Sequence, residues 1–343
     1  MGHTTRNARI ESIARRTQLV RLLGAGLATT GLAAVAQDKP IPPSVKPAGP
    51  NVWLAYEQAQ LDDAYDQRVW ASNMMALIKR GVTNSAIALN YLPPKKVWRY
   101  GEGEHQTIEG FIAPGVRNAP VHIFVRGGAW IQGSAAEYAY LAENFIAKGI
   151  HFLAVDFPNV SQVGGNLAVL GQSVRDAIAW VARHAQEFGG DPNRLFISGH
   201  SSGGHLAAVA LTTDWQSAYG LAPNLLKGAV LISGLYDLKP VRLSARSSYI
   251  KFTDETEQNL SPQRFVDRIS TPITLSYGSL DSPEFQRQSR DFAAALQQAG
   301  KSVEVIEADN FNHFEMVESL ASPFGFAGRA ALRHINTYAL PPR

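Results

Sequence analysis

The sequence predicts an α/β fold with a mainly parallel central sheet, helices on both faces of that sheet and an N-terminal helical extension. Beyond residue 97, short apolar runs of strand length alternate with segments of helical periodicity, which is the pattern of repeated βα units. One of these runs leads through a Gly-x-Ser-x-Gly turn directly into a helix of small residues. The chain has 343 residues, enough for one large domain with its own core.

Residues 1–36 are predicted to be a cleavable export signal. Arg15 and Arg16 precede an uncharged stretch, 22–37, that is rich in Ala, Gly, Leu and Thr and contains an Ala-Val-Ala sequence ending at Ala36. The arginine pair and the mild hydrophobicity favour the twin-arginine route. A membrane anchor is the alternative, but the run is shorter than the roughly 18–20 apolar residues of a spanning helix. We therefore expect cleavage near Ala36, no stable membrane anchor and a periplasmic or secreted protein.

Two segments lie between this signal and the predicted sheet. Residues 37–50 are rich in proline and are expected to form an extended linker. Residues 51–92 carry helical patterning and begin a single domain that we expect to span 51–343. Packing onto the domain is the simpler role for this extension, and the alternative is a cap over a ligand pocket, because such pockets are mostly apolar and often lidded. Its large apolar side chains include Trp53, Leu54, Leu61, Tyr65, Trp70, Met74, Met75 and Leu77.

The strands of the predicted sheet are runs rich in apolar and β-branched residues. They cover 107–112, 121–125, 150–155, 195–198, 229–233, 273–277 and 303–306. Helices are expected over 169–188, 284–299 and 327–338, where apolar residues recur at helical spacing. The segment 237–270, between two of the strands, is long, polar and only partly helical. We expect this insertion to form a second wall of the pocket.

Charge and composition exclude several classes of protein. The whole chain has a net charge of +3, but five arginines and one glutamate lie in residues 1–36, which leaves 27 basic and 28 acidic side chains in the remainder. No basic excess is therefore left to attract nucleic acid. The absence of cysteine excludes disulfides, thiolate metal sites and a cysteine nucleophile. Neither a metalloprotease histidine pair nor a Walker-type phosphate loop is present, so we expect no metal or organic cofactor.

The turn at 199–203, Gly-His-Ser-Ser-Gly, has the sequence of the nucleophile elbow of the α/β-hydrolase fold. The central residue of such an elbow sits in a strained turn, so the flanking positions must be nearly without side chain. Gly199 and Gly203 meet that requirement, and Ser201 is the candidate nucleophile. A chance match is the alternative for the motif alone, but the strand before it and the helix after it favour the catalytic interpretation.

A serine nucleophile needs a base and an acid, which this fold supplies in the chain order Ser, Asp or Glu, His. Asp281 follows a buried apolar run, at the strand end where catalytic groups collect in open α/β sheets. His313 follows the last strand. Asp237 is the rival for the acid, because some hydrolases place it after the preceding strand, and Glu284 is a weaker third choice. We favour Asp281, because its spacing leaves His313 at the next strand end.

The stretch 126–130, Arg-Gly-Gly-Ala-Trp, follows another strand and stands where the hydrolase fold supplies oxyanion donors. The backbone amides of Gly128 and Ala129, together with that of Ser202, are the expected oxyanion hole, and an ordinary Gly-Gly turn is the alternative. Expected substrate-binding side chains are those near predicted strand ends. They are Trp130, Arg126, Tyr236 and Phe311.

Several segments together resemble the arylformamidase (kynurenine formamidase) branch of the α/β-hydrolases, over roughly residues 121–320. The resemblance is carried by 199–208, 213–215, 221–228, 233–240, 281–289 and 312–320. The last two segments are the most specific. They imply that the family's acid corresponds to Asp281 and its base to His313, in agreement with the chain order.

Two departures separate this chain from that pattern. The family's His-Gly-Gly-x-Trp stands here as Arg126-Gly-Gly-Ala-Trp, and Arg is a permanent cation with no acceptor. Arg126 either binds an acidic group of the substrate or pairs with an acidic side chain and braces the loop. The second departure is the export signal: tryptophan breakdown is cytoplasmic, so an exported relative is expected to have another physiological substrate.

The sequence as a whole predicts an exported serine hydrolase that cleaves a carboxylic ester or an aryl formamide of a small molecule through an acyl-enzyme intermediate. A polysaccharide or polymer deacylase is the second possibility, and it would need an open cleft. A catalytically silent binding module on a hydrolase scaffold is the third. The set of Ser201, Asp281 and His313 argues against that last class.

Overall fold

The computed structural model describes residues 49–339. The predicted export signal, 1–36, and nearly all of the predicted linker, 37–50, lie outside these residues. Within the described range, no helix is both long enough and apolar enough to cross a membrane. All described residues belong to one compact unit.

The described residues fold around an eight-stranded sheet with the order β1-β2-β4-β3-β5-β6-β7-β8. β2 pairs antiparallel with β1 and with β4, and every other neighbouring pair is parallel. The strands are β1 Lys96–Arg99, β2 Thr107–Phe111, β3 Ala119–Val125, β4 His151–Val155, β5 Gly190–His200, β6 Leu226–Ile232, β7 Ile273–Gly278 and β8 Val303–Ala308. The predicted α/β-hydrolase fold with a mainly parallel sheet is confirmed.

The seven predicted strands are all present, and the sequence analysis missed one, β1. This strand has only four residues, Lys-Val-Trp-Arg, of which three are exposed. It lies at the edge of the sheet, where one face and one side meet solvent. A strand in that position needs no continuous apolar run, so hydrophobic periodicity does not reveal it.

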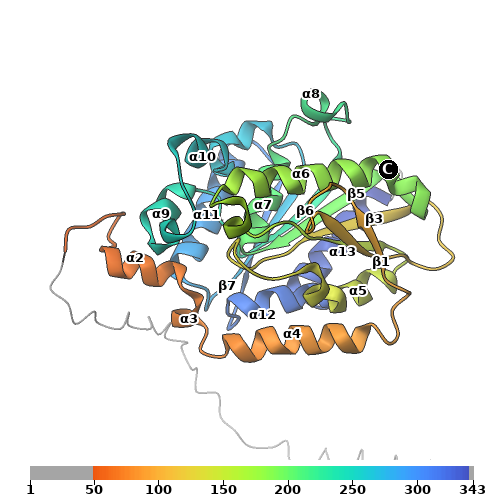
Figure 1. The fold of residues 1–343 in the computed structure, drawn as a ribbon, viewed down its shortest axis with the longest axis horizontal. Coiled ribbons are helices and arrows are strands. Elements are labelled where there is room, and N and C mark those ends of the chain that lie inside the picture. The colour runs from red at the N-terminus through yellow and green to blue at the C-terminus, as the bar shows by residue number, and fades with distance from the viewer. Residues whose placement is uncertain (1–48, 340–343) are drawn as a thin grey trace, which may run out of the picture. The chain divides into compact units, whose positions relative to one another are not determined.

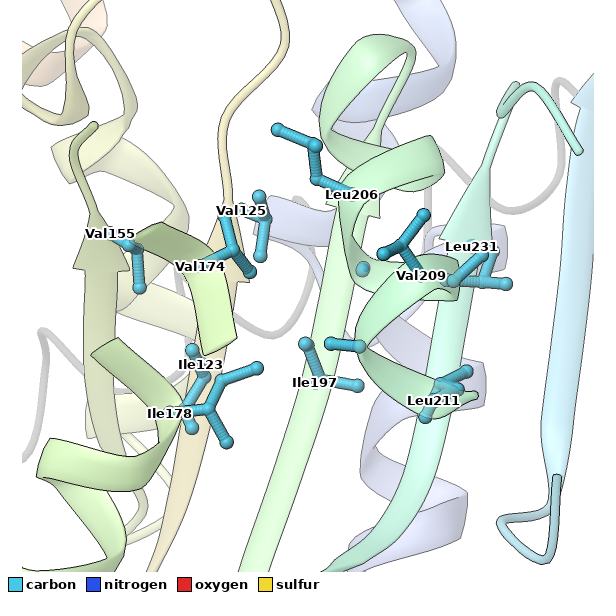
Figure 2. Close-up of a cluster of buried hydrophobic side chains, with 14 of the residues drawn as sticks. Ile123, Val125, Val155, Val174, Ile178, Ile197, Leu206, Val209, Leu211 and Leu231 are labelled. Atoms are coloured by element: carbon cyan, nitrogen blue, oxygen red, sulfur yellow. The ribbon is translucent and has the colours of Figure 1, made fainter. Parts of the chain in front are cut away.

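Helices cover both faces of the sheet, as the alternation of side chains along β3 requires. Ile123 and Val125 point into a core shared with α6 Leu167–His184 and α7 Ser202–Leu211 (Figure 2). Phe124 points into the opposite core, shared with α5 Ala142–Ile146 and α13 Phe326–Ala339. Because both faces are buried, the central strands read as continuous apolar runs rather than alternating ones.

The N-terminal extension forms α2 Gln58–Tyr65, α3 Gln67–Trp70 and α4 Met74–Ala88. Figure 1 shows α4 running beside α12 His313–Glu318. α2 is held against the start of α11 Pro283–Gln298 by buried hydrogen bonds. The hydroxyl of Tyr65 donates to Glu284 at 2.9 Å and accepts from Gln288 at 2.8 Å, and Ser282 Oγ donates to the Ala64 carbonyl at 2.6 Å.

The segment 237–270 folds into short helical pieces, as its partly helical pattern predicts. They are α9 Leu238–Leu243, η4 Ala245–Ser248, α10 Asp254–Asn259 and η5 Pro262–Arg268. This insertion contacts the N-terminal extension directly. The Ala245 N–H donates to Asp62 at 2.6 Å, and Arg246 Nη2 donates to the Tyr65 carbonyl at 2.9 Å. These hydrogen bonds hold the insertion and the N-terminal extension together.

Candidate active site

Ser201 lies in the turn between β5 and α7, with φ 57° and ψ −125°, a conformation that few non-glycine residues adopt. The two flanking glycines are required by close backbone contacts. A Cβ on Gly199 would lie 2.3 Å from the Gly203 carbonyl oxygen, and one on Gly203 would lie 2.1 Å from the Val125 carbonyl oxygen. The elbow expected from the sequence is therefore formed, and it presents Ser201 at a helix N-terminus, where backbone N–H groups favour negative charge.

His313 and Asp281 meet in a buried pair. His313 Nδ1 lies 2.8 Å from Asp281 Oδ1, and both side chains are almost fully buried. His313 is the first residue of α12, and the start of this helix is fixed by Asn312, whose side chain caps it in a reciprocal arrangement with Glu315. The pairing leaves Nε2 of His313 as the ring nitrogen available to another group.

Ser233 also holds Asp281, and sequence reasoning missed it. Its hydroxyl donates to Asp281 Oδ2 at 2.5 Å, so each oxygen of this carboxylate has a partner. Ser233 follows β6 and has φ 46°, an unusual conformation for serine. Ser233 follows β6, the neighbour of β7, and this position was the only sequence signal that could have placed it near Asp281.

The rival acids occupy other positions. Asp237 caps α9 by accepting from the Lys239 N–H at 3.0 Å. Glu284 is buried, and it accepts from Arg287 at 2.7 Å and from the Tyr65 hydroxyl at 2.9 Å. Neither carboxylate is paired with His313, so the geometry supports the choice of Asp281.

The loop after β3 carries three consecutive residues with positive φ: Gly128 at 113°, Ala129 at 52° and Trp130 at 66°. A Cβ on Gly128 would lie 1.9 Å from the Gln132 carbonyl oxygen, so only glycine fits there. The Trp130 N–H donates to Ser202 Oγ at 3.3 Å, which ties this loop to the residue after the candidate nucleophile. Gly128 and Ala129 line the same cavity as Ser201, the arrangement expected of oxyanion donors.

Arg126 braces this loop from behind and is buried, with 1% of its surface exposed. Its Nε donates to Asp156 at 2.6 Å, Nη1 to the Gln132 carbonyl at 2.9 Å and Nη2 to the Phe157 carbonyl at 2.7 Å. The guanidinium also lies 4.1 Å from the centre of the Phe157 ring. The expectation that Arg126 contacts the substrate is therefore corrected, because its donors are taken up by the protein.

The other three expected substrate-binding residues pack into the protein instead of lining the cavity. Trp130 is fully buried with its ring edge-on to His205, Tyr236 is fully buried and stacks on Phe292, and Phe311 packs edge-on to Phe326. All three follow strands, but a position after a strand fixes only the backbone. The direction of the side chain depends on local φ and on neighbouring elements, which the sequence pattern did not reveal.

The cavity at Ser201 has a volume of about 770 Å³, and half of its lining residues belong to the extension or the insertion. The extension contributes Gln67, Met74 and Met75, and the insertion contributes Arg246 and Tyr249. Ser201 and His313 both lie on its wall. The hydrogen bonds among the described residues do not include one from Ser201 to His313, a contact that often tightens only when substrate binds. Residues of 51–92, for which packing was the simpler role and a cap the alternative, and of 237–270, expected to form a second wall, both contribute to this lining.

Three other buried histidines near the sheet are held neutral. Burial lowers the pKa of His122 to about 3 and that of His205 to about 4. Burial also lowers the pKa of His200 well below its ordinary value, and this ring donates through Nε2 to the His313 carbonyl at 2.9 Å. His200 thus supports the backbone of His313.

Across residues 49–339, no group of three or more His, Asp or Glu side chains is placed to hold a metal ion.

Comparison with known proteins gives matches over most of the described residues. A family model described as BD-FAE matches residues 113–229. A kynurenine formamidase of Danio rerio is 29% identical over 283 residues, which cover 78% of this chain and 93% of that protein. A kynurenine formamidase of Salmo salar is 32% identical over 228 residues, covering 64% of this chain and 75% of that protein.

A solved structure of a candidate thioesterase from Silicibacter sp. tm1040 superposes with a TM-score of 0.70. The two chains are 22% identical, and the match covers 79% of this chain and 98% of that one. At this level of identity the likeness concerns the fold alone.

The bracing role of Arg126 predicts that Arg126→Met lowers the free energy of unfolding by about 3–5 kcal/mol, because Asp156 and two carbonyls lose their buried partner. The rate of hydrolysis should fall equally on neutral and acidic substrates. Urea denaturation and steady-state kinetics measure the two effects. Arg80→Met is the matched control: it breaks an exposed pair with Glu318 and should cost about 1 kcal/mol or less. Wild-type stability of Arg126→Met, or a rate loss confined to acidic substrates, would contradict bracing.

Proposed function

Because the chain belongs to the kynurenine formamidase family of the α/β-hydrolases and is a hydrolase, we propose that it cleaves a carboxylic ester or an aryl formamide through Ser201, His313 and Asp281. One observation carries the proposal: His313 is paired with Asp281 at 2.8 Å and lines the same cavity as Ser201. The names of the two formamidases support the formamide, and the same catalytic groups serve ester cleavage.

The proposed reaction is acyl transfer in two halves. His313 Nε2 takes the proton of Ser201 Oγ as that oxygen attacks the substrate carbonyl carbon, and the histidinium then gives the proton to the leaving oxygen or nitrogen. Asp281 holds the imidazole in the required tautomer and stabilises its positive form. Water, deprotonated by His313, attacks the acyl-enzyme, and Ser201 regains its proton as the acid is released.

The backbone amides of Gly128, Ala129 and Ser202 are the proposed oxyanion donors. They come from two elements joined by the Trp130 to Ser202 hydrogen bond, so their relative position is set before substrate arrives. Fixed donors of this kind cost no reorganisation as negative charge develops, and the loss of one typically costs ~10²–10³ in rate.

The shape of the cavity favours a small substrate. Residues of the extension and the insertion make up half of the lining around Ser201, whereas a polysaccharide or polymer deacylase would need an open cleft. A silent binding module has no use for the buried His313 and Asp281 pair. A small ester or aryl formamide is therefore the proposed substrate class, with no metal or organic cofactor in the reaction.

We expect Ser201→Ala to lower kcat by roughly 10⁶-fold, because the nucleophile itself is removed. The smaller side chain should leave the fold intact, which circular dichroism and thermal unfolding can confirm. A fluorophosphonate probe should add one label to the wild type at Ser201, located by peptide mass spectrometry, and none to the variant. Turnover near the wild-type rate in Ser201→Ala would rule out the mechanism.

The acid can be tested with a matched pair of variants. Asp281→Asn should lower kcat by about 10³–10⁴-fold, because an amide favours the wrong histidine tautomer. Asp237→Asn makes the same chemical change at the N-cap of α9 and should leave kcat near the wild-type value. The opposite ranking in steady-state kinetics would transfer the role of acid to Asp237.

We also propose that residues 1–36 direct export, from their basic start, short apolar stretch and Ala-Val-Ala end. Residues 1–45 fused to a reporter that is active only outside the cytoplasm should give signal in a bacterial host. Replacing Arg15 and Arg16 together by lysine should abolish the signal if the route is twin-arginine. Export that survives the double change would assign the general secretory route, and a silent wild-type fusion would refute export.

A further inference from the structure

Arg246, in the insertion, is a buried cation with unused donors. Only 6% of its surface is exposed, and its one side-chain hydrogen bond runs from Nη2 to the Tyr65 carbonyl at 2.9 Å. Its Nε and Nη1 atoms are buried and find no partner among residues 49–339. A buried charge without a hydrogen-bonded partner is costly to the folded state. A ligand that accepts hydrogen bonds from the unused Arg246 donors would remove that cost.

Gln67, in the extension, is the second such group. It is 9% exposed, and neither Oε1 nor Nε2 has a hydrogen-bond partner among the described residues. Gln67 and Arg246 both line the cavity that contains Ser201 and His313. Buried amides and guanidiniums are normally satisfied, and here two unsatisfied ones, from different segments, belong to residues that line the same cavity.

The acidic side chains nearby do not use these donors. Both oxygens of Asp66 accept from the Arg68 side chain, at 2.6–3.0 Å, and Asp66 acts on Arg246 through its charge without a hydrogen bond. Asp62 accepts from the Ala245 N–H at 2.6 Å and from Gln58 at 2.9 Å. Since these carboxylates accept from other donors, Nε and Nη1 of Arg246 have no hydrogen-bond partner among the described residues.

The position of Arg246 relates it to the reacting atoms. Its guanidinium carbon lies 5.4 Å from the centre of the Trp130 ring and 5.8 Å from that of Tyr65, so two aromatic side chains limit its movement. Trp130 directly follows Ala129, one of the proposed oxyanion donors. The charge therefore lies close to the Trp130 ring, in the wall of the cavity that contains Ser201.

We propose that Arg246 and Gln67 form a binding subsite for a carboxylate of the substrate, so that the enzyme prefers esters or formamides that carry a negative charge. The guanidinium supplies charge-assisted hydrogen bonds, which planar carboxylates accept well, and the Gln67 amide supplies a further donor. This inference rests on the proposed function, because it names the substrate class of the same cavity.

The first test compares a charged substrate with its neutral counterpart of the same shape. 3-Acetoxybenzoate and 3-acetoxybenzamide carry the charge on the leaving group, and the mono-4-nitrophenyl ester of glutaric acid and 4-nitrophenyl pentanoate carry it on the acyl group. The wild type should favour the acid in at least one pair. Arg246→Met should reduce kcat/KM for that acid by roughly 10- to 100-fold, as expected for loss of a hydrogen bond to a charged group, and change the neutral compound little.

Matched variants separate recognition from support of the fold. Arg242→Met removes a cation from the same insertion, one that pairs with Asp254 and Glu257, and should leave the acid preference intact. Arg246→Lys keeps the charge without the planar fork and should retain part of the preference. Gln67→Leu leaves the arginine in place and should reduce the preference less than Arg246→Met. If Arg246→Met does not fold, the last two variants still decide the outcome.

A binding measurement keeps this inference separate from the proposed function. Calorimetry on Ser201→Ala with benzoate and with benzamide needs no turnover, and benzoate should bind more tightly in the Arg246 protein than in the Arg246→Met double variant. Selective benzoate binding without any hydrolysis by the wild type would refute the proposed function and leave the subsite standing. Hydrolysis with no acid preference in either pair, or equal losses on acid and neutral compounds in Arg246→Met, would overturn the subsite.

Discussion

The arrangement of the site depends on one backbone contact, between Gly203 and the end of β3. A Cβ at Gly203 would lie 2.1 Å from the Val125 carbonyl oxygen and 2.3 Å from that of Arg126, so the first turn of α7 touches the strand end without an intervening side chain. This contact brings the residue after Ser201 beside the loop that starts at Gly127. The backbone N–H groups proposed as oxyanion donors, which belong to different βα units, are thereby brought close together.

Arg126, the residue before the loop of 127–130, supports it by hydrogen bonds to neighbouring segments. A histidine has two ring nitrogens, whereas arginine has five N–H donors in a fixed fork. The guanidinium uses them on Asp156 and on carbonyls of Gln132 and Phe157. Where the resemblance implies a histidine, this chain therefore has a buried arginine whose charge-assisted hydrogen bonds help to hold the positive φ values of the loop.

Sequence reasoning succeeded where the signal was local or followed from chain order. The elbow is a five-residue pattern, and the strand ends before Asp281 and His313 follow from apolar runs and spacing. Asp156 was also within reach, because it follows β4, the parallel neighbour of β3, and so had to lie near Arg126. Ser233 offered the same kind of signal, because it follows β6, the neighbour of β7, whereas no sequence pattern pointed to Gln67, whose surroundings come from distant segments.

The extension links the acid to the proposed subsite through adjacent residues of α2. The Ala64 carbonyl accepts from Ser282, the residue after Asp281, and the Tyr65 carbonyl accepts from Arg246. The Tyr65 hydroxyl is fixed by Glu284. One helical end thus positions both the start of α11 and the buried cation. Both contacts are made by backbone carbonyls, those of Ala64 and Tyr65. Their geometry therefore follows the placement of α2 itself. A displacement of α2 would move the loop of Asp281 and Arg246 together, so the proposed binding of a charged group would be coupled to the alignment of the proposed catalytic groups.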